Sequence, residues 1–333
     1  VRKAEFDLDE SQIKPYFEMD NVLHNGVFYA ATQMYGITFK ERKDIPTYNP
    51  DMKVYEVFDK DGSSLALFYT DYFKRDSKSG GAWMDVFVEQ DGLTGAKPVV
   101  YNVCNFTKPV AGQPALLSFD DVTTLFHEFG HGLHHLLTQV NEHDVSGISG
   151  VEWDAVELPS QFMENFCWEW DVLKHMTSHV ESGEPLPRAL FDKMTAAKNF
   201  QSGLQTLRQI EFSLFDMLLH TEHSPADDFM QLLDAVRQEV AVTRPPAFSR
   251  TVHTFSHIFA GGYAAGYYSY KWAEVLSADA YAAFEETVGA DGSPSAQTGR
   301  KYREAILEAG GSRPAMESFK AFRGREPSLD ALL

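Results

Sequence analysis

The sequence feature that most constrains the fold is residues 118–140, SFDDVTTLFHEFGHGLHHLLTQV, in which apolar side chains recur at helical spacing. These apolar positions are Val122, Leu125, Phe126, Phe129, Leu133, Leu136, Leu137 and Val140. Ser118 and Asp121 form an S-x-x-D pattern, which is typical of a helix start. We therefore predict a helix that is crowded with apolar residues and that the rest of the chain packs around.

This predicted helix carries an H-E-x-x-H pattern at residues 127–131. Four residues of α-helix turn about 400° and rise about 6 Å, so His127 and His131 lie one above the other. Glu128 lies roughly 100° round the helix and borders the pair. Two neutral imidazoles suit zinc, and an adjacent carboxylate suits a base that takes a proton from water. The alternative is a pair of surface imidazoles beside a solvated glutamate, which the apolar character of the helix disfavours.

A catalytic zinc site needs a third protein ligand, and the sequence offers two candidates. His134 follows His131 by one turn, but three donors along one straight helix cannot occupy three corners of a tetrahedron. Glu157 lies in a separate segment, VEWDAVELPSQFMENF, that can pack across the first helix. We predict one Zn²⁺ ion held by His127, His131 and Glu157, with one corner open for water. His134 is then either a residue that supports the ligands from behind or a packing residue. A closed structural site would need a fourth protein ligand, for which only His134 is a candidate.

Two carboxylates near the predicted third ligand are candidates for supporting the site. We expect Asp154 or Glu164 to hold a ligand imidazole by hydrogen bonding to its second ring nitrogen. The alternative for either residue is a plain helix-surface carboxylate. The ligand set does not by itself fix the metal, because cobalt or manganese can occupy similar ligands.

The rest of the chain predicts an α+β fold, mainly helical, with one small sheet. We expect one catalytic region over residues 1–333, made of a helical lead-in (1–50), a small sheet (51–115) and a helical remainder (116–333). Residues 59–62 resemble a hairpin turn between two strands. Gly80 and Gly81 end a polar loop before another strand, and they would let a substrate backbone approach the sheet edge as an extra strand. The alternative is a sheet that only supports the helices.

Tyr263, Tyr267 and Tyr270 are spaced by four and three residues, which places them on one face of a helix. On spacing alone, an aromatic stripe is more typical of a core, and a lone His257 is more typical of a packing histidine. A zinc enzyme that cleaves amides, however, needs neutral donors for the oxyanion of the tetrahedral intermediate. Phenols and an imidazole can supply such donors.

The composition restricts the partners of the chain. A formal net charge of −19 disfavours binding to nucleic acid and to anionic membranes, and no run of about 18 apolar residues could span a bilayer. The same charge could attract cationic peptides, or it could serve solubility alone. Cys104 and Cys167 are far apart, as expected for reduced thiols in a cytoplasmic protein without a signal peptide. The chain begins with Val1, so we expect a fragment or a processed piece.

Several motifs together resemble the thimet-type family of zinc oligopeptidases, along essentially the whole chain. They are HEFGHGLHH, VELPSQFMENF, FSHIFAGGYAAGYYSYKW, GGSRPAMESFKAFRGRE and NFTKP at residues 105–109. The resemblance implies a mainly helical fold, zincin-like around the metal, and cytosolic cleavage of short unstructured peptides in a channel between two domains. It also implies site residues, which are the ligands His127, His131 and Glu157, the general base Glu128, the oxyanion donors His257, Tyr263 and Tyr270, and Tyr267 on the same loop.

The expected function is a zinc metalloendopeptidase for short peptides. A dipeptidyl carboxypeptidase of the same family is one alternative, and a non-catalytic peptide-binding half-domain is another. Members of this family are about twice as long as this chain, and the N-terminal half that forms the opposite channel wall has no counterpart here. We therefore also count that N-terminal half among the expected partners.

Overall fold

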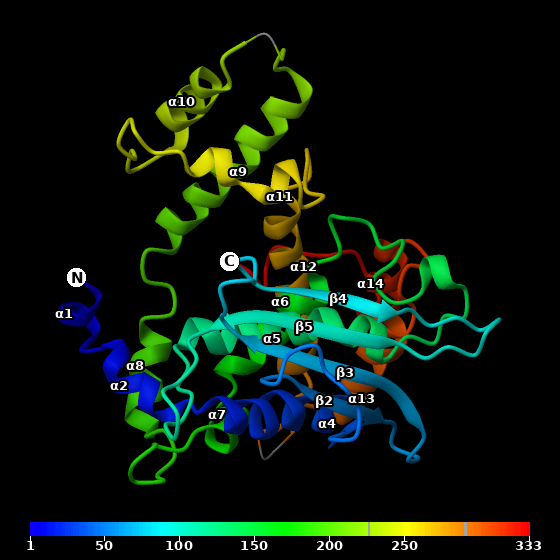
Figure 1. The fold of residues 1–333 in the computed structure, drawn as a ribbon. Helices are drawn as coiled ribbons and strands as arrows, with labels where there is room; N and C mark the ends of the chain where they lie inside the picture. Colours follow the sequence, from blue (N-terminus) through cyan, green and yellow to red (C-terminus); the bar gives the residue numbers. More distant parts are fainter. Residues whose placement is uncertain (226, 290–291) are drawn as a thin grey trace.

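The computed structural model describes residues 1–225, 227–289 and 292–333, and it confirms the mainly helical α+β class (Figure 1). The α-helices are α1 (Arg2–Phe6), α2 (Glu10–Ile13), α3 (Met19–Val22), α4 (Tyr29–Tyr35), α5 (Phe119–Leu136), α6 (Leu158–Glu164), α7 (Trp170–Met176), α8 (Arg188–Ala196), α9 (Ser202–Thr221), α10 (Phe229–Val240), α11 (Ser256–Phe259), α12 (Ser269–Glu285), α13 (Ala296–Tyr302) and α14 (Ala315–Arg323). Shorter 3₁₀ or π-helical segments are η1 (Lys14–Tyr16), η2 (Leu23–Phe28), η3 (His143–Val145), η4 (Asn165–Trp168), η5 (Thr251–Thr254) and η6 (Arg303–Leu307). Across the described ranges, no helix has both the length and the apolar character needed to cross a membrane.

The strands form one mixed sheet in the order β1-β2-β3-β5-β4. Their bounds are β1 (Thr38–Glu41), β2 (Lys53–Phe58), β3 (Ser64–Phe73), β4 (Trp83–Val88) and β5 (Val99–Phe106). The turn at residues 59–62 joins β2 to β3 as a hairpin, as predicted, and Gly62 adopts a φ of 85° there. β3 and β5 are parallel, whereas β4 pairs antiparallel with β5 and forms one edge of the sheet.

The first fifty residues are not wholly helical, so that part of the sequence prediction is wrong. The helices end at Tyr35, because Gly36 takes a left-handed conformation with a φ of 73°. Thr38–Glu41 then forms β1, which pairs antiparallel with β2 at the other edge of the sheet. This strand depends on hydrogen bonds to residues about 15–20 positions away, so local periodicity did not indicate it. The other four strands lie within residues 51–115, as expected.

α5 is the central helix, and it packs between the sheet and α6. The predicted start is confirmed, because Ser118 and Asp121 form a reciprocal capping box. Its apolar residues are buried, and the ring of Phe129 contacts the rings of Phe28, Phe39 and Phe68 from the lead-in and the sheet. The helix that carries the H-E-x-x-H pattern is therefore rigidly held by aromatic packing on the face opposite the histidines.

Helices α9, α10 and α11 form a separate lobe that stands away from the sheet at the top of Figure 1. This lobe has its own apolar cluster, made of Phe215, Leu233, Val236, Val252, Ile258 and Tyr267. Tyr267 belongs to the predicted tyrosine stripe, so the stripe lies where the lobe meets the rest of the chain. Tyr263 and Tyr267 lie in the loop before α12, whereas Tyr270 lies in the first turn of α12, so the prediction that all three share one face of a helix is wrong.

Candidate active site

The close approach of α5 and α6 brings the predicted ligands together. Gly130 faces the start of α6, where a Cβ atom on this residue would lie 2.6 Å from Ser160 Cα and closer still to the Pro159 carbonyl oxygen. Only glycine permits helices to pack at this distance. Glu157 occupies the N-cap position of α6 and is therefore placed directly over the histidine face of α5.

The three predicted ligands converge on one point. His127 Nε2 lies 3.2 Å from Glu157 Oε2, and His131 Nε2 lies 3.1 Å from the same oxygen. All three donor atoms lie within 4.8 Å of one another. Tetrahedral zinc with bonds of about 2 Å places its ligand atoms about 3.3 Å apart, so these separations suit a single zinc ion. Within the residues that the structure describes, no other group of His, Cys, Asp and Glu side chains converges in this way.

The contact made by the second ring nitrogen of His127 distinguishes the two candidate supporting carboxylates, Glu164 and Asp154. His127 Nδ1 lies 2.6 Å from Glu164 Oε1, which orients the imidazole with Nε2 toward Glu157. Asp154 is placed differently, because its carboxylate lies near the hydroxyl of Tyr268 and, after burial, raises the pKa of that phenol. Among the described residues, Asp154 forms no hydrogen bond or ion pair with either histidine. α6 begins after Asp154, so that residue lies before the helix that faces α5.

His134, the rejected third ligand, points away from the ligand group. It lies in a separate small cavity with Leu158, Ile306 and Ser318, where its side chain is 3% exposed. The prediction of a packing role for His134 agrees with this placement. The turn of α5 that carries His134 faces the C-terminal segments rather than the cleft.

The ligand carboxylate is itself held in place by two hydroxyl groups. Ser160 Oγ lies 2.8 Å from Glu157 Oε2, and the hydroxyl of Tyr263 donates to Glu157 Oε1. Burial alone would raise the pKa of Glu157, but the imidazoles of His131 and His127 hold that pKa well below its ordinary value. The carboxylate is therefore ionised and oriented, as a metal ligand requires.

Glu128 lies beside the ligand group in the same cavity. Its side chain is buried, and Oε2 has no hydrogen-bond partner among the described residues. Burial raises the pKa of this carboxyl group. An unpaired, buried carboxylate oxygen next to a metal site is suited to accept a proton from water.

The tyrosine loop and His257 border the same cavity from the side of the lobe. The Tyr263 and Tyr270 rings are stacked with centroids 4.9 Å apart, and the His257 ring lies 6.0 Å from that of Tyr270. Burial raises the pKa of Tyr263 and of Tyr270 above the ordinary value, and it raises the pKa of Tyr267 to about 12. All three phenols are therefore neutral hydrogen-bond donors at neutral pH.

Two cavities extend the site into a cleft. One, of about 770 Å³, lies between the β4 edge and the start of the tyrosine loop, with apolar walls that include Trp83, Met84 and Trp153. Another, of about 600 Å³, lies on the α6 and α12 side, with polar walls that include Gln161 and Glu274. Because both cavities are lined by His127 and Tyr270, they border the same site from two directions.

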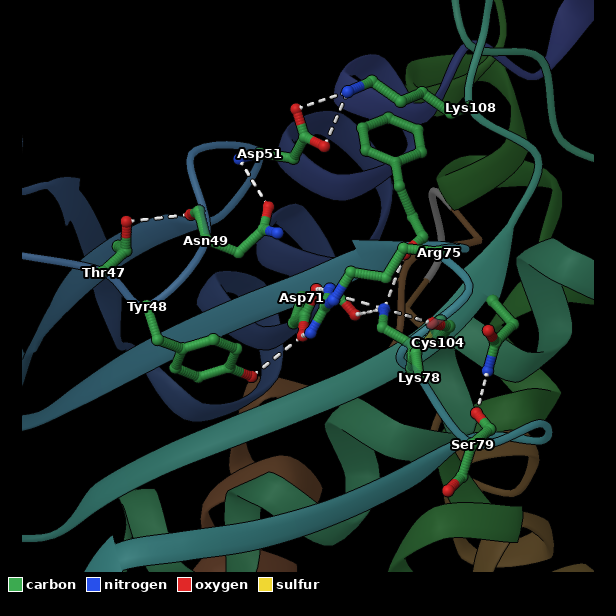
Figure 2. Close-up of polar contacts among 12 residues, drawn as sticks. Thr47, Tyr48, Asn49, Asp51, Asp71, Arg75, Lys78, Ser79, Cys104 and Lys108 are labelled. Atoms are coloured by element: carbon green, nitrogen blue, oxygen red, sulfur yellow. Dashed lines mark hydrogen bonds and ion pairs between the residues drawn. The ribbon is translucent and has the colours of Figure 1, made fainter.

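Gly80 and Gly81 lie at the wall of the cleft, just before the edge strand β4. The loop that carries them is anchored by the buried ammonium group of Lys78, which lies 2.7 Å from the carbonyl oxygens of Phe73 and Cys104 (Figure 2). Asn105 Nδ2 donates to the Ser79 and Gly81 carbonyl oxygens at 2.9 and 2.7 Å. The glycines are therefore held in a fixed position in the cavity that the three candidate ligands also line.

Sequence reasoning did not identify several residues that hold parts of the site, namely Lys78, Asn105 and Ser160. Ser160 follows Glu157 by three residues, so helical spacing could have indicated its contact with Glu157. The polar partners of Lys78 lie up to 26 residues away in the chain. No local pattern indicates such long-range contacts.

Comparisons with known proteins identify the family of the chain. A family model described as Peptidase family M3 matches residues 1–333. The chain is 52% identical to oligopeptidase A of Salmonella typhimurium over 98% of this chain and 48% of that protein. It is 45% identical to dipeptidyl carboxypeptidase of the same organism over 100% of this chain and 49% of that protein.

A solved structure of a Pyrococcus furiosus carboxypeptidase has a TM-score of 0.50 at 15% identity, covering 95% of this chain and 57% of that one, and it supports the fold alone. The chain spans about half the length of the curated relatives that it matches. The family model covers every residue of the chain, and the identity to these relatives extends over nearly all of it. The chain therefore belongs to peptidase family M3.

Proposed function

We propose that this chain carries the catalytic site of a zinc metalloendopeptidase that hydrolyses short, unstructured peptides. The observation that carries the proposal is the convergence of His127 Nε2 and His131 Nε2 on Glu157 Oε2, with the unpaired Oε2 of Glu128 in the same cavity. Zinc bound by these three ligands would supply a Lewis acid that polarises a carbonyl group and lowers the pKa of water.

Glu128 acts as the general base. Its Oε2 accepts a proton from the attacking water, the water oxygen bonds to the scissile carbonyl carbon, and the same proton later passes to the departing amine nitrogen. The bond between the carbonyl carbon and that nitrogen then breaks. Burial raises the pKa of Glu128 toward neutral pH. A carboxylate with such a pKa is suited both to accept the proton from water and to release it to the amine.

His257, Tyr263 and Tyr270 stabilise the oxyanion. They are neutral donors at the edge of the cavity that holds Glu128. The hydroxyl of Tyr263 donates to Glu157 here, so Tyr263 orients the ligand carboxylate as well as bordering the oxyanion position. Gln161 Nε2 lies 3.0 Å from the Tyr270 carbonyl oxygen, which fixes the start of α12 against α6.

The substrate backbone binds along the edge strand β4. Gly80 and Gly81 leave open space at their Cα atoms, since a Cβ on either would meet nothing within 4 Å. A peptide can therefore approach the loop closely and add to the free edge of the sheet. Tyr267 shapes the opposite wall through its contact with Tyr270.

We also propose a cytoplasmic location, which is supported by the two buried free thiols of Cys104 and Cys167. The acidic net charge supports peptides rather than nucleic acid as substrates.

A dipeptidyl carboxypeptidase is the second candidate, favoured by the 45% identity to proteins of that name. The cavities on two sides of the ligands favour an endopeptidase, because a peptide can extend past the metal in both directions. Mass spectrometry of the products from one defined ten-residue peptide separates the two activities. Internal cleavage supports the endopeptidase, and exclusive release of C-terminal dipeptides supports the carboxypeptidase.

The test of the general base is a Glu128→Gln variant of the purified chain. We expect it to retain about one zinc ion per chain, because Glu128 is not a ligand, and to lose hydrolysis by a factor of about 10²–10⁴. Metal analysis and peptide cleavage are measured on the same sample. Full turnover by this variant would refute the assignment, and a wild-type chain that binds peptides without cutting them would support a binding half-domain.

A further inference from the structure

The tyrosine loop has a backbone conformation that needs external support. Ala265 has a φ of 52°, in the left-handed region that non-glycine residues rarely adopt. Such a conformation persists only where neighbouring groups hold it. Ala265 lies between Tyr263 and Tyr267, so its conformation determines where both tyrosines are directed.

One buried carboxylate holds this backbone. Asp216 Oδ1 accepts a hydrogen bond from the Ala265 amide at 3.0 Å, and Oδ2 accepts one from the Tyr267 amide at 2.9 Å. The Asp216 side chain is 1% exposed and projects from α9. On the same helix, His220 Nδ1 lies 2.9 Å from Asp216 Oδ1. Both oxygens of Asp216 are thus used by amides of the tyrosine loop.

The fixed backbone connects the lobe to the candidate active site. Tyr267 is anchored in the lobe, because its hydroxyl lies 3.1 Å from Gln209 Oε1 and its ring packs against Phe212 and Phe255. On its other side, the Tyr267 ring lies 5.1 Å from that of Tyr270. The position of α9 therefore determines where Tyr267 lies and, through the contact between the two rings, where Tyr270 lies beside the candidate metal ligands.

We propose that Asp216 is a positioning residue for hydrolysis, which fixes the tyrosine loop so that the Tyr263 and Tyr270 hydroxyls are preorganised for the oxyanion. This inference rests on the function proposed above. Asp216 does not reach the cavity that holds the ligands, so it acts through the backbone of the loop. Its removal should impair the chemical step more than substrate binding.

The first test is Asp216→Asn. The amide keeps one acceptor oxygen but presents an NH₂ group to a backbone N–H, so one of the two bonds is lost. Displacement of reacting groups by about 1 Å costs up to about 10²-fold in rate, and we expect kcat to fall by about 10- to 100-fold with KM changed less than about threefold. A fall in kcat/KM of the same size that arises only from a higher KM, with kcat unchanged, would overturn the proposal.

Glu211→Gln is the matched control. Glu211 lies on the same helix, its side chain is 3% exposed, and it pairs with Arg237 at 2.9 Å. Within the described residues, it forms no hydrogen bond with the tyrosine loop. The substitution removes the same buried charge and should lower thermal stability while kcat stays within about twofold of wild type. If both variants lose kcat equally at equal loss of stability, Asp216 has only a structural role and the proposal is wrong.

Ala265→Gly in the Asp216→Asn background tests the mechanism directly. Glycine adopts a positive φ without steric cost, so the loop needs less support and part of the lost kcat should return. Failure of this double variant to recover any kcat would argue against backbone positioning.

Hydrogen exchange tests the two contacts independently of catalysis and of variant folding. In the wild-type chain, the Ala265 and Tyr267 amides should exchange at least about tenfold more slowly than in an unstructured peptide of the same sequence. Exchange at the unprotected rate would overturn the proposal whatever the variants do. Conversely, a wild-type chain that shows protected amides but cleaves no peptide would refute the proposed function and leave the contacts established.

Discussion

The phenols of Tyr263 and Tyr270 stay protonated because they are buried next to an ionised carboxylate. A neutral phenol can donate to a developing oxyanion without first losing a charge–charge interaction, so its contribution is realised in the transition state. Tyr263 already donates to Glu157. We therefore propose Tyr270 as the phenol whose hydroxyl donates to the substrate.

Replacement of Tyr270 by Phe should lower kcat by about 10²- to 10³-fold and change KM much less, since the donor is lost but the ring packing remains. Steady-state hydrolysis of a defined peptide measures both constants. Tyr268→Phe is the control, because Tyr268 is 41% exposed and its hydroxyl faces Asp154 rather than the cleft. A loss in Tyr270→Phe that lies wholly in KM would make Tyr270 a binding residue.

The two candidate supporting carboxylates, Glu164 and Asp154, allow a second comparison between single residues. Glu164→Gln removes the anion at 2.6 Å from His127 Nδ1 and should weaken zinc affinity by about 10- to 100-fold. Asp154→Asn should leave zinc affinity unchanged, because Asp154 contacts neither ligand histidine among the described residues. Competition with a zinc chelator of known affinity measures both variants. Equal weakening by the two substitutions would show that net charge, rather than the contact to His127, is responsible.

Residue types and spacing were enough to predict that His127, His131 and Glu157 converge, because the two histidines are related by one helical turn and Glu157 begins the segment that packs across them. The choice between Asp154 and Glu164 could not be made from the sequence. It depends on where α6 begins and on which of its faces meets α5, since Asp154 lies before the first residue of α6 and Glu164 is its last residue. Asp216 was missed for a different reason, because its hydrogen bonds join segments about 50 residues apart in the sequence, which no local pattern indicates.

At the scale of elements, the site depends on the distance between α5 and α6, which Gly130 sets. A Gly130→Ala variant places a Cβ against the backbone of residues 159 and 160, which cannot move as a flexible side chain does. We expect a stability loss of about 1–3 kcal/mol from overpacking, together with loss of zinc as Glu157 is displaced from the histidines. Thermal unfolding and metal analysis of the purified variant measure the two effects.

Gly132→Ala on the same helix is the control for this prediction. A Cβ at Gly132 would lie 3.6 Å from Asn102 Oδ1, which is an ordinary contact, and alanine favours helix over glycine by up to about 1 kcal/mol. This variant should keep its zinc and be as stable as wild type or more so. Loss of zinc in both variants would mean that the helix itself, and not its distance from α6, is sensitive to the substitution.

The elements that the sequence predicted best are those with local signals. The start of α5 is specified by Ser118 and Asp121, and the β2–β3 hairpin by a turn that ends in Gly62. β1 was missed because its four residues become a strand only through pairing with β2. The parallel pairing of β3 with β5, which leaves β4 as the free edge beside the cleft, is likewise a property of the assembled sheet.

At the scale of the whole molecule, two buried histidines link folding to pH. Burial lowers the pKa of His134 to about 3 and that of His135 to about 4, against an ordinary value near 6.5. His135 Nε2 accepts a hydrogen bond from the Ile148 amide at 3.3 Å, which requires the neutral ring. The folded chain therefore binds fewer protons at these sites than the unfolded chain does.

Because the folded pKa values lie below the unfolded ones, these histidines cost no stability above about pH 6.5, and their protonation favours unfolding as the pH falls below it. Between about pH 6 and pH 4.5, each contributes a loss of up to about 1.4 kcal/mol per pH unit. Urea unfolding of the chelator-treated chain across this range measures the slope. A His134→Gln variant should reduce the pH dependence of the unfolding free energy by about one bound proton, whatever its absolute stability. An unaltered slope in His134→Gln would show that this imidazole is already protonated in the folded chain, which its burial at the centre of the molecule argues against.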